Sequence, residues 1–448
     1  MNSLFRNIFS KKREIDADAE TLSRLKDEIE HLLVEEIDAW YPVSIDTTYG
    51  GFYTDLDYKF EPNGSQQKTV IHQARHLWAI SRAGSRYPSN NSFREYADHG
   101  FSFISEKFWD SENGGFYTEV DRKGNLVRKD TPMSAFGQSF AMYGIVAYHR
   151  ISHKPEALRL AIDTFHWLED YMYDKEYKGY FSYIDQNRNI IERPGVGSVL
   201  DGNCLKGVNS VLHLIEAFTE LYKTWPDPLL RIRLAELLNL IQSKVIQPKG
   251  FLHNYFDRDW TPVRIKKRTK AHVRNFLYLD YVSYGHGVEA AFLILEASET
   301  LQNRELSNNT LKNTKMLVDH SLTYGLDRRK GGLFKNGYYF DRRRKPTLMD
   351  KSKIWWVQAE ALYTFLLFSS LFPKDEQNYF EKFNQQLSHI KKYFIDYKYG
   401  GWFEKELDKS RNEGRKPKSH EWKATYHTYR AIENCVELLD KMITDRSN

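Results

Sequence analysis

The stretch Gly50-Gly51-Phe52-Tyr53-Thr54-Asp55-Leu56-Asp57 is the first of six copies of one glycine-aromatic motif. The second copy reads Gly114-Gly115-Phe116-Tyr117-Thr118-Glu119-Val120-Asp121. In each copy, glycine precedes a strand-like run that begins with an aromatic residue or leucine. The last glycines of the six copies are Gly51, Gly115, Gly179, Gly250, Gly332 and Gly401. Spacings of 64 to 82 residues between these glycines predict a repeat architecture.

Each interval between motifs has room for two helices and their loops. Apolar residues recur there at helical spacing, as at Ile71, Ala74, Leu77 and Trp78. One more helix is expected at about 17–40 and another at about 424–442, which brings the total to twelve. We therefore expect an all-α fold, an (α/α)6 barrel of six helical hairpins with short β-hairpins at one mouth. The absence of βαβ alternation and of a glycine-rich phosphate loop argues against Rossmann and P-loop proteins.

The composition argues against several classes of partner. Of 448 residues, 65 are Lys or Arg and 60 are Asp or Glu, so the net charge of +5 is too dilute for a nucleic-acid surface. The densest basic run, residues 264–274, reads as a solvated loop. No apolar run approaches the roughly 18–20 residues of a membrane span. With only Cys204 and Cys435, we expect no disulfide framework and a cytoplasmic location.

The expected domain organisation is simple. Residues 17–448 are expected to form one catalytic domain, and residues 1–16 a frayed N-terminal arm. Aromatic residues make up 15% of the chain, which is enough for a core and also suits stacking against sugar rings. The sequence leaves the oligomeric state open.

The helix that follows each motif should begin at the mouth, so matching positions on these helices should face one cavity. These positions lie 23 to 36 residues after the motif glycine. They are occupied by Arg75, Gln138, His213, His286, Trp356 and His427. A single histidine on an apolar helix face is more often a core residue. Three histidines in matching positions beside an arginine and a tryptophan are more typical of an active site.

Two of these histidines are followed three residues later by a glutamate, Glu216 after His213 and Glu289 after His286. Residues three apart share a helix face, so each glutamate could orient its histidine or make a structural contact. The repeated His-x-x-Glu pattern also admits a carboxylate-bridged metal site. Because the two pairs fall in different repeats and no third carboxylate motif accompanies them, we expect neither a metal nor a cofactor.

This set of side chains suits proton transfer at carbon. Imidazole titrates near neutrality, so two histidines can remove a proton from one face of a carbon and return one to the other. An arginine can hold vicinal oxygens and stabilise an enediolate. A glycosidase would instead need two opposed carboxylates, whereas the residues in matching positions are rich in histidine. The residues thus indicate deprotonation of the carbon next to an aldehyde.

The chain resembles the N-acylglucosamine 2-epimerase superfamily, most closely its cellobiose 2-epimerase branch. The resemblance runs from Gly50 to about Leu439, and its most specific segments are 209–218, 283–290, 355–361 and Tyr426-His427 with Arg430. It implies an (α/α)6 barrel that interconverts C2 epimers at a reducing-end sugar through a cis-enediolate, without a cofactor.

The resemblance also implies a role for each matching position. His286 and His427 resemble the acid/base pair that works on opposite faces of C2, and His213 resembles the histidine that assists ring opening. Arg75 resembles the arginine that binds substrate oxygens, and Glu289 the carboxylate that orients its histidine. The expected substrate-binding residues are Asn209, Trp356, Glu360, Trp422 and Gln138.

Three positions depart from the family pattern. Relatives usually have an acidic residue at Gly287 and a tyrosine at Phe136, and often another histidine at Val211. The acid/base set is intact, while substrate preference, as free sugar or β-1,4-disaccharide, stays open. The alternatives are an aldose–ketose isomerase converting mannose to fructose, a non-catalytic carbohydrate-binding protein and a glycoside hydrolase.

Overall fold

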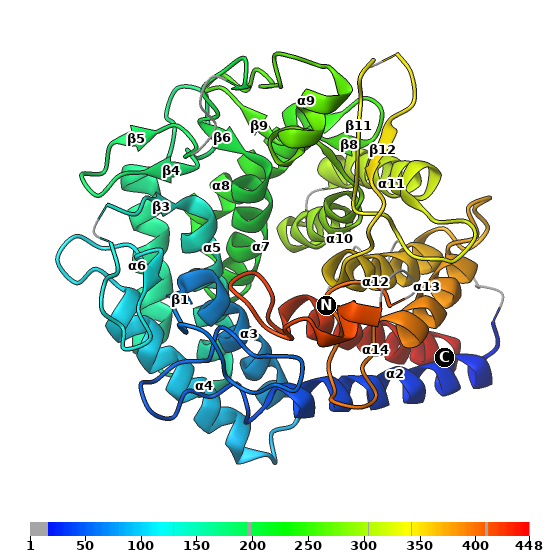
Figure 1. Cartoon of the computed structure of the whole chain (residues 1–448), viewed down its shortest axis with the longest axis horizontal. Coiled ribbons are helices and arrows are strands. Elements are labelled where there is room, and N and C mark those ends of the chain that lie inside the picture. Colours follow the sequence, from blue (N-terminus) through cyan, green and yellow to red (C-terminus); the bar gives the residue numbers. More distant parts are fainter. Residues whose placement is uncertain are drawn as a thin grey trace.

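The computed structural model describes residues 17–128, 130–194, 199–302, 304–341, 343–407 and 411–447. The expected N-terminal arm, residues 1–16, lies outside these ranges. Within them, twelve helices of 13 residues or more form two concentric rings around a common axis (Figure 1). This arrangement is the (α/α)6 barrel that the six motifs predict, so the expected fold class is confirmed.

The inner ring consists of six helices, each in contact with the next. They are α3 (Val70–Arg86), α5 (Ala135–Ser152), α7 (Val208–Thr224), α10 (Tyr284–Leu301), α12 (Trp355–Leu371) and α14 (Tyr426–Ser447). Helix α14 also contacts α3, which closes the ring.

The outer ring covers the inner one. Its helices are α2 (Ala19–Trp40), α4 (Asn91–Phe103), α6 (Pro155–Tyr171), α8 (Pro228–Leu240), α11 (Arg304–Gly325) and α13 (Tyr379–Tyr393). Helices α4 to α13 each pack on the inner helix that precedes them, while α2 packs on α14. The first and last of the twelve helices therefore complete the barrel as a pair.

The two rings differ in burial as their sequences do. In α12, 15 of 17 residues are buried, whereas in α4 only 5 of 13 are. An inner helix is covered on both sides and must be apolar almost all round, while an outer helix needs one apolar stripe. Across the described ranges, no helix has both the length and the apolar character to cross a membrane.

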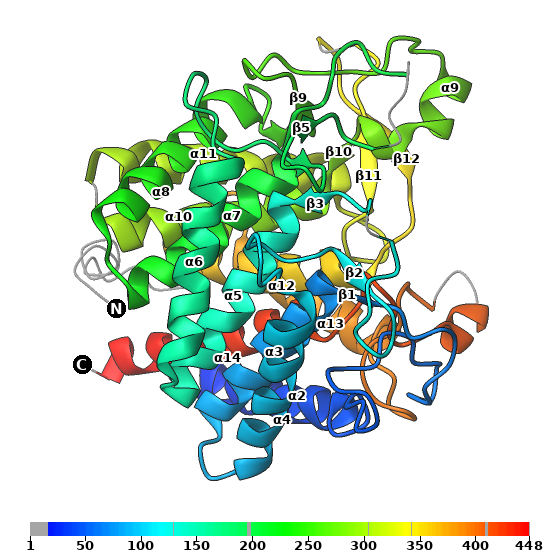
Figure 2. The same cartoon turned by 90° about the vertical axis from the view of Figure 1, so that its left-hand side faces the viewer.

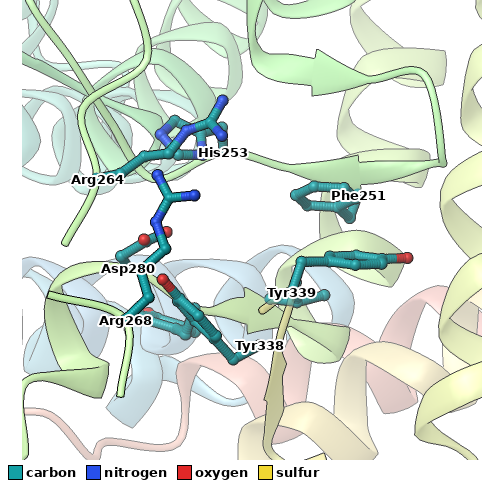
Figure 3. A pocket seen from close by; sticks show the side chains of 9 residues that line it. Phe251, His253, Arg264, Arg268, Asp280, Tyr338 and Tyr339 are labelled. Carbon is teal, nitrogen blue, oxygen red and sulfur yellow. The ribbon is translucent and has the colours of Figure 1, made fainter. Parts of the chain in front are cut away.

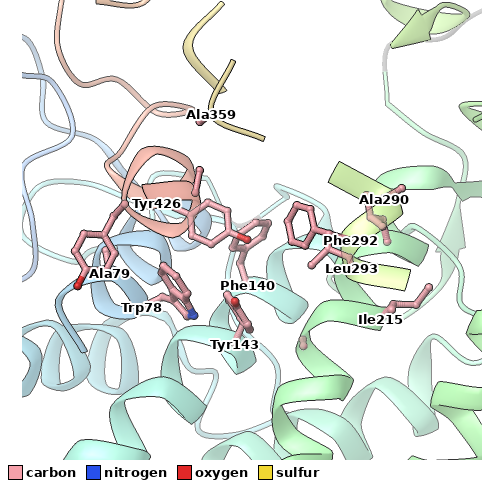
Figure 4. Packing of buried hydrophobic residues seen from close by; sticks show 14 of the residues in the cluster. Trp78, Ala79, Phe140, Tyr143, Ile215, Ala290, Phe292, Leu293, Ala359 and Tyr426 are labelled. Carbon is pink, nitrogen blue, oxygen red and sulfur yellow. The ribbon is translucent and has the colours of Figure 1, made fainter. Parts of the chain in front are cut away.

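Aromatic side chains fill the barrel interior between the inner helices (Figure 4). Trp78 stacks on Tyr143 with ring centroids 5.4 Å apart. Tyr426 makes edge-to-face contacts, with its ring centroid 5.2 Å from that of Trp78 and 5.4 Å from that of Phe140. Offset and edge-to-face contacts of this kind stabilise beyond the area that they bury. They connect helices α3, α5 and α14 into one packed core.

Short strands and loops gather at one end of the barrel, which we call the mouth, and the C-terminus lies at the other end (Figure 2). The strands are β1 (Lys68–Thr69), β2 (Glu119–Val120), β3 (Met133–Ser134), β4 (Tyr183–Ile184), β5 (Ile190–Ile191), β6 (Lys206–Gly207), β7 (Ile246–Gln247), β8 (Phe251–Leu252), β9 (Tyr255–Phe256), β10 (Val282–Ser283), β11 (Asn336–Tyr338) and β12 (Thr347–Asp350). A short helix, α9 (Lys270–Asn275), joins them. All pairings are antiparallel, as in β1 with β2.

Each glycine-aromatic motif forms a tight turn that returns the chain from an outer helix to the mouth. In the first copy, Ile45 bridges to Phe52 across the turn, and Gly50 and Gly51 have φ of 90° and 65°. A side chain disfavours this left-handed conformation, which explains the glycines. A Cβ on Gly51 would also lie 2.5 Å from the amide oxygen of Gln73.

A buried lysine–aspartate pair supports four of these turns. Nζ of Lys68 lies 3.1 Å from Oδ2 of Asp46, and neither side chain is exposed. The same pairing recurs as Lys206–Asp174, Lys353–Asp327 and Lys418–Asp396. Buried charges require a partner, so these pairs fix the turn to the segment that leads into the next inner helix. The sequence analysis did not anticipate them.

Candidate active site

The three predicted histidines lie at the mouth ends of inner helices. His213 is the sixth residue of α7, His286 the third of α10 and His427 the second of α14. Oγ of Ser283 caps α10 by accepting a hydrogen bond from the backbone N–H of His286 at 3.1 Å. Because helix N-termini carry partial positive charge, this end of the barrel favours a substrate that develops negative charge.

Trp356 contacts two of the histidines. Its ring centroid is 5.0 Å from that of His286 and 5.7 Å from that of His427. Gly285 makes this possible, because a Cβ there would lie 2.5 Å from the indole. The structure thus brings the two histidines predicted as the acid/base pair into contact with the same indole ring.

Burial keeps both imidazoles in their neutral form. Burial lowers the pKa of His286 to about 4, with Glu289 opposing the shift. Burial and the nearby charge of Arg75 hold the pKa of His427 well below its usual value. Both rings are therefore neutral at pH 7, so each can accept a proton.

His427 is oriented by a carboxylate that the sequence analysis had assigned to sugar binding. Nδ1 of His427 lies 2.5 Å from Oε1 of Glu360, which is fully buried. Burial raises the pKa of Glu360 to about 7 despite the opposing charge of Arg430. The pair can therefore hold or release one proton near neutral pH.

His213 has the partner that its sequence spacing predicts. Nδ1 of His213 lies 2.9 Å from Oε2 of Glu216, three residues along α7. Its ring packs against Phe136 and Phe140, with centroids 5.0 and 4.8 Å away. Because Glu216 engages Nδ1 of His213, Nε2 is the ring nitrogen that can face a substrate.

Glu289 does not orient His286, contrary to the expectation from their spacing. Oε1 of Glu289 accepts from Nη2 of Arg430 at 2.8 Å and lies 3.8 Å from Nδ1 of His427. Nδ1 of His286 is buried without a hydrogen-bond partner in the described structure. The guanidinium offers Glu289 a full charge, whereas the neutral imidazole does not.

Gln138 is also corrected by the structure. Its Oε1 accepts from the backbone N–H of Phe116, and its Nε2 donates to the Phe116 carbonyl, both at 2.8 Å. Gln73 and Gln358 make the same paired contacts to Phe52 and Leu333. Gln138 therefore fastens a glycine-aromatic motif to its inner helix, and both ends of its amide are engaged in that contact.

Arg75 comes from α3 and lies over the rings of Phe140 and Tyr426, with its guanidinium carbon 4.6 and 5.5 Å from their centroids. Nη1 donates to the carbonyl of Trp422 at 2.7 Å, while Nε is buried without a partner in the described structure. The side chain thus has unused donors at the mouth end of the ring, as binding of substrate oxygens requires.

Two further predicted contact residues lie at the same end. Oδ1 of Asn209, in the first turn of α7, has no hydrogen-bond partner within the described ranges. The side chain of Trp422 is 51% exposed, in the loop that Arg75 fixes. An exposed indole held through its own backbone suits stacking on a ligand better than it suits a core.

Arg430 is part of the family resemblance, but the sequence analysis gave it no role at the site. Its guanidinium is buried and donates to Glu216, Glu289 and Glu360, which lie on three other inner helices. It lies one turn farther along α14 than His427. A comparison of the residues near the start of each inner helix therefore does not include it. The available signal is the spacing His427-x-x-Arg430, which puts both residues on one helix face.

The acidic groups here also raise the question of a metal. Ligand atoms of Glu289, Glu360 and His427 lie within 4.8 Å of one another. Arg430, however, donates to both carboxylates at 2.7–2.8 Å and already supplies their counter-charge. A bound cation would have to lie beside that guanidinium, which like-charge repulsion disfavours.

A separate small hollow of about 20 Å³ lies on the flank of the mouth (Figure 3). Its lining includes Arg264, Arg268, Asp280 and Tyr338 but none of the predicted site residues. Arg264 is only partly exposed, so the basic run begins as part of a wall, whereas Arg268 is solvated as expected.

Comparison with known proteins identifies the family. Residues 51–431 match the profile of N-acylglucosamine 2-epimerase (GlcNAc 2-epimerase). A cellobiose 2-epimerase from Dictyoglomus turgidum is 29% identical over 94% of this chain and 100% of its own length. A D-mannose isomerase from Marinomonas mediterranea is 23% identical over 89% of this chain and 93% of its own.

Solved structures agree. The cellobiose 2-epimerase from Spirochaeta thermophila superposes with a TM-score of 0.79 at 27% identity, covering 94% of this chain and 98% of that one. A D-mannose isomerase superposes with a TM-score of 0.76 at 21% identity, over 92% of this chain and 97% of the other, which shows a shared fold. The chain therefore belongs to the N-acylglucosamine 2-epimerase family.

Proposed function

We propose that this protein is a cofactor-independent sugar 2-epimerase that interconverts glucose- and mannose-type reducing ends through a cis-enediolate. Family membership and the likeness to cellobiose 2-epimerases support an isomerase of this kind. The observation that carries the proposal is the placement of two neutral imidazoles, His286 and His427, against one Trp356 ring. With two imidazoles at the site, one can remove the C2 proton and the other can return a proton to that carbon.

The reaction begins with opening of the sugar ring. His213 is the group proposed to move this proton, because Glu216 holds its Nδ1 and leaves Nε2 for the substrate. Phe136 and Phe140 exclude water from one side of the imidazole. The open-chain aldehyde acidifies the proton at C2.

One histidine then removes the C2 proton, and the charge develops on the enediolate oxygens. Arg75 is proposed to hold these oxygens with its unused donors. Rotation about C2–C3 presents the other face of the carbon to the second histidine, which returns a proton. Trp356 gives the sugar an apolar face to turn against.

The His427–Glu360 pair supplies the required change of proton state. With Glu360 ionised, Nδ1–H of His427 points at it and Nε2 is a base. With the carboxyl protonated, its proton can pass to Nδ1 as Nε2 gives up its own. Because the pKa of Glu360 is raised to about 7, both forms are populated near neutrality.

The alternative is an aldose–ketose isomerase, which would share the enediolate but return the proton to C1. The similarity to D-mannose isomerases supports this alternative. One base that carries a proton from C2 to C1 is enough for that reaction. The second imidazole beside Trp356 is a base that this isomerisation does not need, and its presence favours epimerisation.

The deciding experiment is NMR of mannose, glucose, cellobiose and mannobiose incubated with the protein in deuterated water. A C2 epimer that carries deuterium at C2 is the expected product, and it identifies the substrate class. Fructose-type signals would establish the isomerase instead. No exchange with any of the four sugars would contradict both activities, and monosaccharide released from a disaccharide would indicate a hydrolase.

A further inference from the structure

Arg430 connects carboxylates from three inner helices. Nη1 donates to Glu216 of α7, and Nη2 donates to Oε1 of Glu289 of α10 at 2.8 Å and to Oε1 of Glu360 of α12 at 2.7 Å. Nη1 also donates to the hydroxyl of Tyr426, which itself donates to Glu216. All of these side chains are buried. One guanidinium is thus shared by Glu216, which contacts His213, and by Glu360, which contacts His427.

The charges in this cluster are unbalanced. Three carboxylates face one guanidinium, so the cluster relieves its excess negative charge by holding a proton. Burial opposes ionisation at Glu216, but the charge of Arg430 and the contact with His213 bring the pKa of Glu216 to about 2. The pKa of Glu360 is raised to about 7, mainly by burial. The proton is therefore held at the carboxylate that touches His427.

The surroundings contain the other charges that matter. The titratable groups around the guanidinium are Arg75 from α3, Tyr143 from α5, His213 and Glu216 from α7, His286 and Glu289 from α10, Glu360 from α12, and Tyr426 and His427 from α14. Among the described residues, only Arg430 makes hydrogen bonds both to Glu216, the partner of His213, and to Glu360, the partner of His427.

We propose that Arg430 is a positioning residue that couples the His213–Glu216 pair to the His427–Glu360 pair, so that a change at one carboxylate alters proton transfer at the other histidine. The proposal rests on the proposed function, which assigns these pairs to ring opening and to C2 chemistry. A guanidinium fork can hold several carboxylate oxygens in fixed directions, whereas a lysine ammonium is a single point charge.

A double-mutant cycle tests the coupling. Glu216→Gln, Glu360→Gln and the double variant keep the side-chain volumes, and kcat for deuterium exchange at C2 is measured for each. Coupled pairs give a double variant at least tenfold faster than the product of the two single effects predicts. Effects that simply multiply would overturn the proposal.

A second measurement separates positioning from structural support. Arg430→Lys is expected to shift the pH profile of kcat by about one pH unit and to lower kcat more than it changes KM. The matched control is Arg82→Lys, because Nε of Arg82 donates to the buried Glu433 at 2.9 Å in an ion pair outside the histidine cluster. Identical pH profiles for both variants would contradict the role. If Arg430→Lys fails to fold, the glutamine cycle still decides.

A third readout does not depend on turnover. In protein labelled with ¹⁵N at histidine, Glu216→Gln is expected to shift the ring-nitrogen signals of His427, although Glu216 bonds to His213 and not to His427. Glu433→Gln is the control and should leave those signals in place. Unmoved His427 signals would refute the coupling even if the protein acts on another sugar. Shifted signals without epimerisation would refute the proposed function alone.

Discussion

Nδ1 of His427 and Oε1 of Glu360 lie 2.5 Å apart in the barrel interior, where both side chains are buried. The two residues come from different inner helices, α14 and α12, and are 67 positions apart in the sequence. Their contact ties a group proposed to act at C2 to a carboxyl group whose pKa is raised to about 7. The proton state of the site therefore depends on how the last two repeats pack.

Removing either proposed acid/base residue should abolish turnover and leave the fold intact. His427→Ala and His286→Ala are each expected to lower the rate of C2 deuterium exchange by roughly 100- to 10,000-fold, the usual size of a general acid/base contribution. Exchange is followed by NMR and folding by circular dichroism. Near-normal exchange in a folded variant would remove that histidine from the mechanism.

Glu360→Gln should change the pH dependence of activity. Below about pH 7 the carboxyl group of Glu360 is protonated and no longer makes Nε2 of His427 a base, so wild-type activity should fall on the acid side. The glutamine cannot titrate, so the variant should be slower and lose this acid limb. A variant that retains the limb with its midpoint unchanged would assign the limb to another group.

Glu360→Gln should also change how stability depends on pH. Whereas activity is expected to fall toward acid pH, the stability that this group contributes falls as the pH rises. The pKa of Glu360 lies at about 7 in the folded protein against an ordinary value of 4.5, so the folded state binds more protons between these pH values. Stability from this group is therefore present below about pH 4.5 and is lost as pH rises to about 7. The Tm of Glu360→Gln relative to wild type should rise through this window. Parallel Tm curves from pH 4 to 8 would contradict the shifted ionisation.

Gln138→Leu should destabilise the protein without affecting sugar binding. It leaves the backbone N–H and carbonyl of Phe116 unsatisfied, at about 1–3 kcal/mol each. Chemical denaturation is expected to show the loss, while KM stays within twofold of wild type. An increased KM with normal stability would return Gln138 to the sugar site.

Trp422→Ala should have the reverse effect. The indole is 51% exposed, so its removal costs little packing, but it lies in the loop held by Arg75. KM for the sugar is expected to rise several-fold at unchanged Tm, given the size of aromatic stacking contributions. The control is Ile232→Ala on the outer helix α8, where the side chain is 58% exposed. Equal KM values in both variants would exclude stacking on Trp422.

Treatment with a chelator should leave the exchange rate unchanged. The charge of Arg430 and the proton held at Glu360 together offset the charges of Glu289 and Glu360, so this part of the cluster has no need of a cation. Activity is compared before and after dialysis against EDTA, and after addition of Mg²⁺, Mn²⁺ or Zn²⁺. Loss on dialysis with recovery on addition of one metal would show that the cluster binds it.

Local sequence spacing predicted some contacts and mispredicted others. The separation of three residues that pairs His213 with Glu216 also separates His286 from Glu289, yet only the first pair forms. Such spacing fixes only that two side chains share a helix face. Glu289 also faces Arg430 across the barrel, and a charge-assisted bond to guanidinium is stronger than one to a neutral imidazole.

Position within the repeat had the same limit. Matching positions on the inner helices indicate six candidate residues, namely Arg75, Gln138, His213, His286, Trp356 and His427. Gln138 nevertheless turns to the backbone of Phe116, because an unpaired N–H and carbonyl inside the barrel must be satisfied. Repeat phase gives the height of a residue on its helix, while its partner depends on the neighbouring repeat.

The sequence by itself determined the barrel and the level of the three histidines on it. Six glycine-aromatic motifs, apolar periodicity and positions counted along each repeat are properties of single segments. Only the tertiary structure decided that Arg430 is shared by Glu216, Glu289 and Glu360, and that Glu360 orients His427. Which charges meet depends on closure of the ring, since competition among buried groups is settled by distance and desolvation across helices that are far apart in sequence.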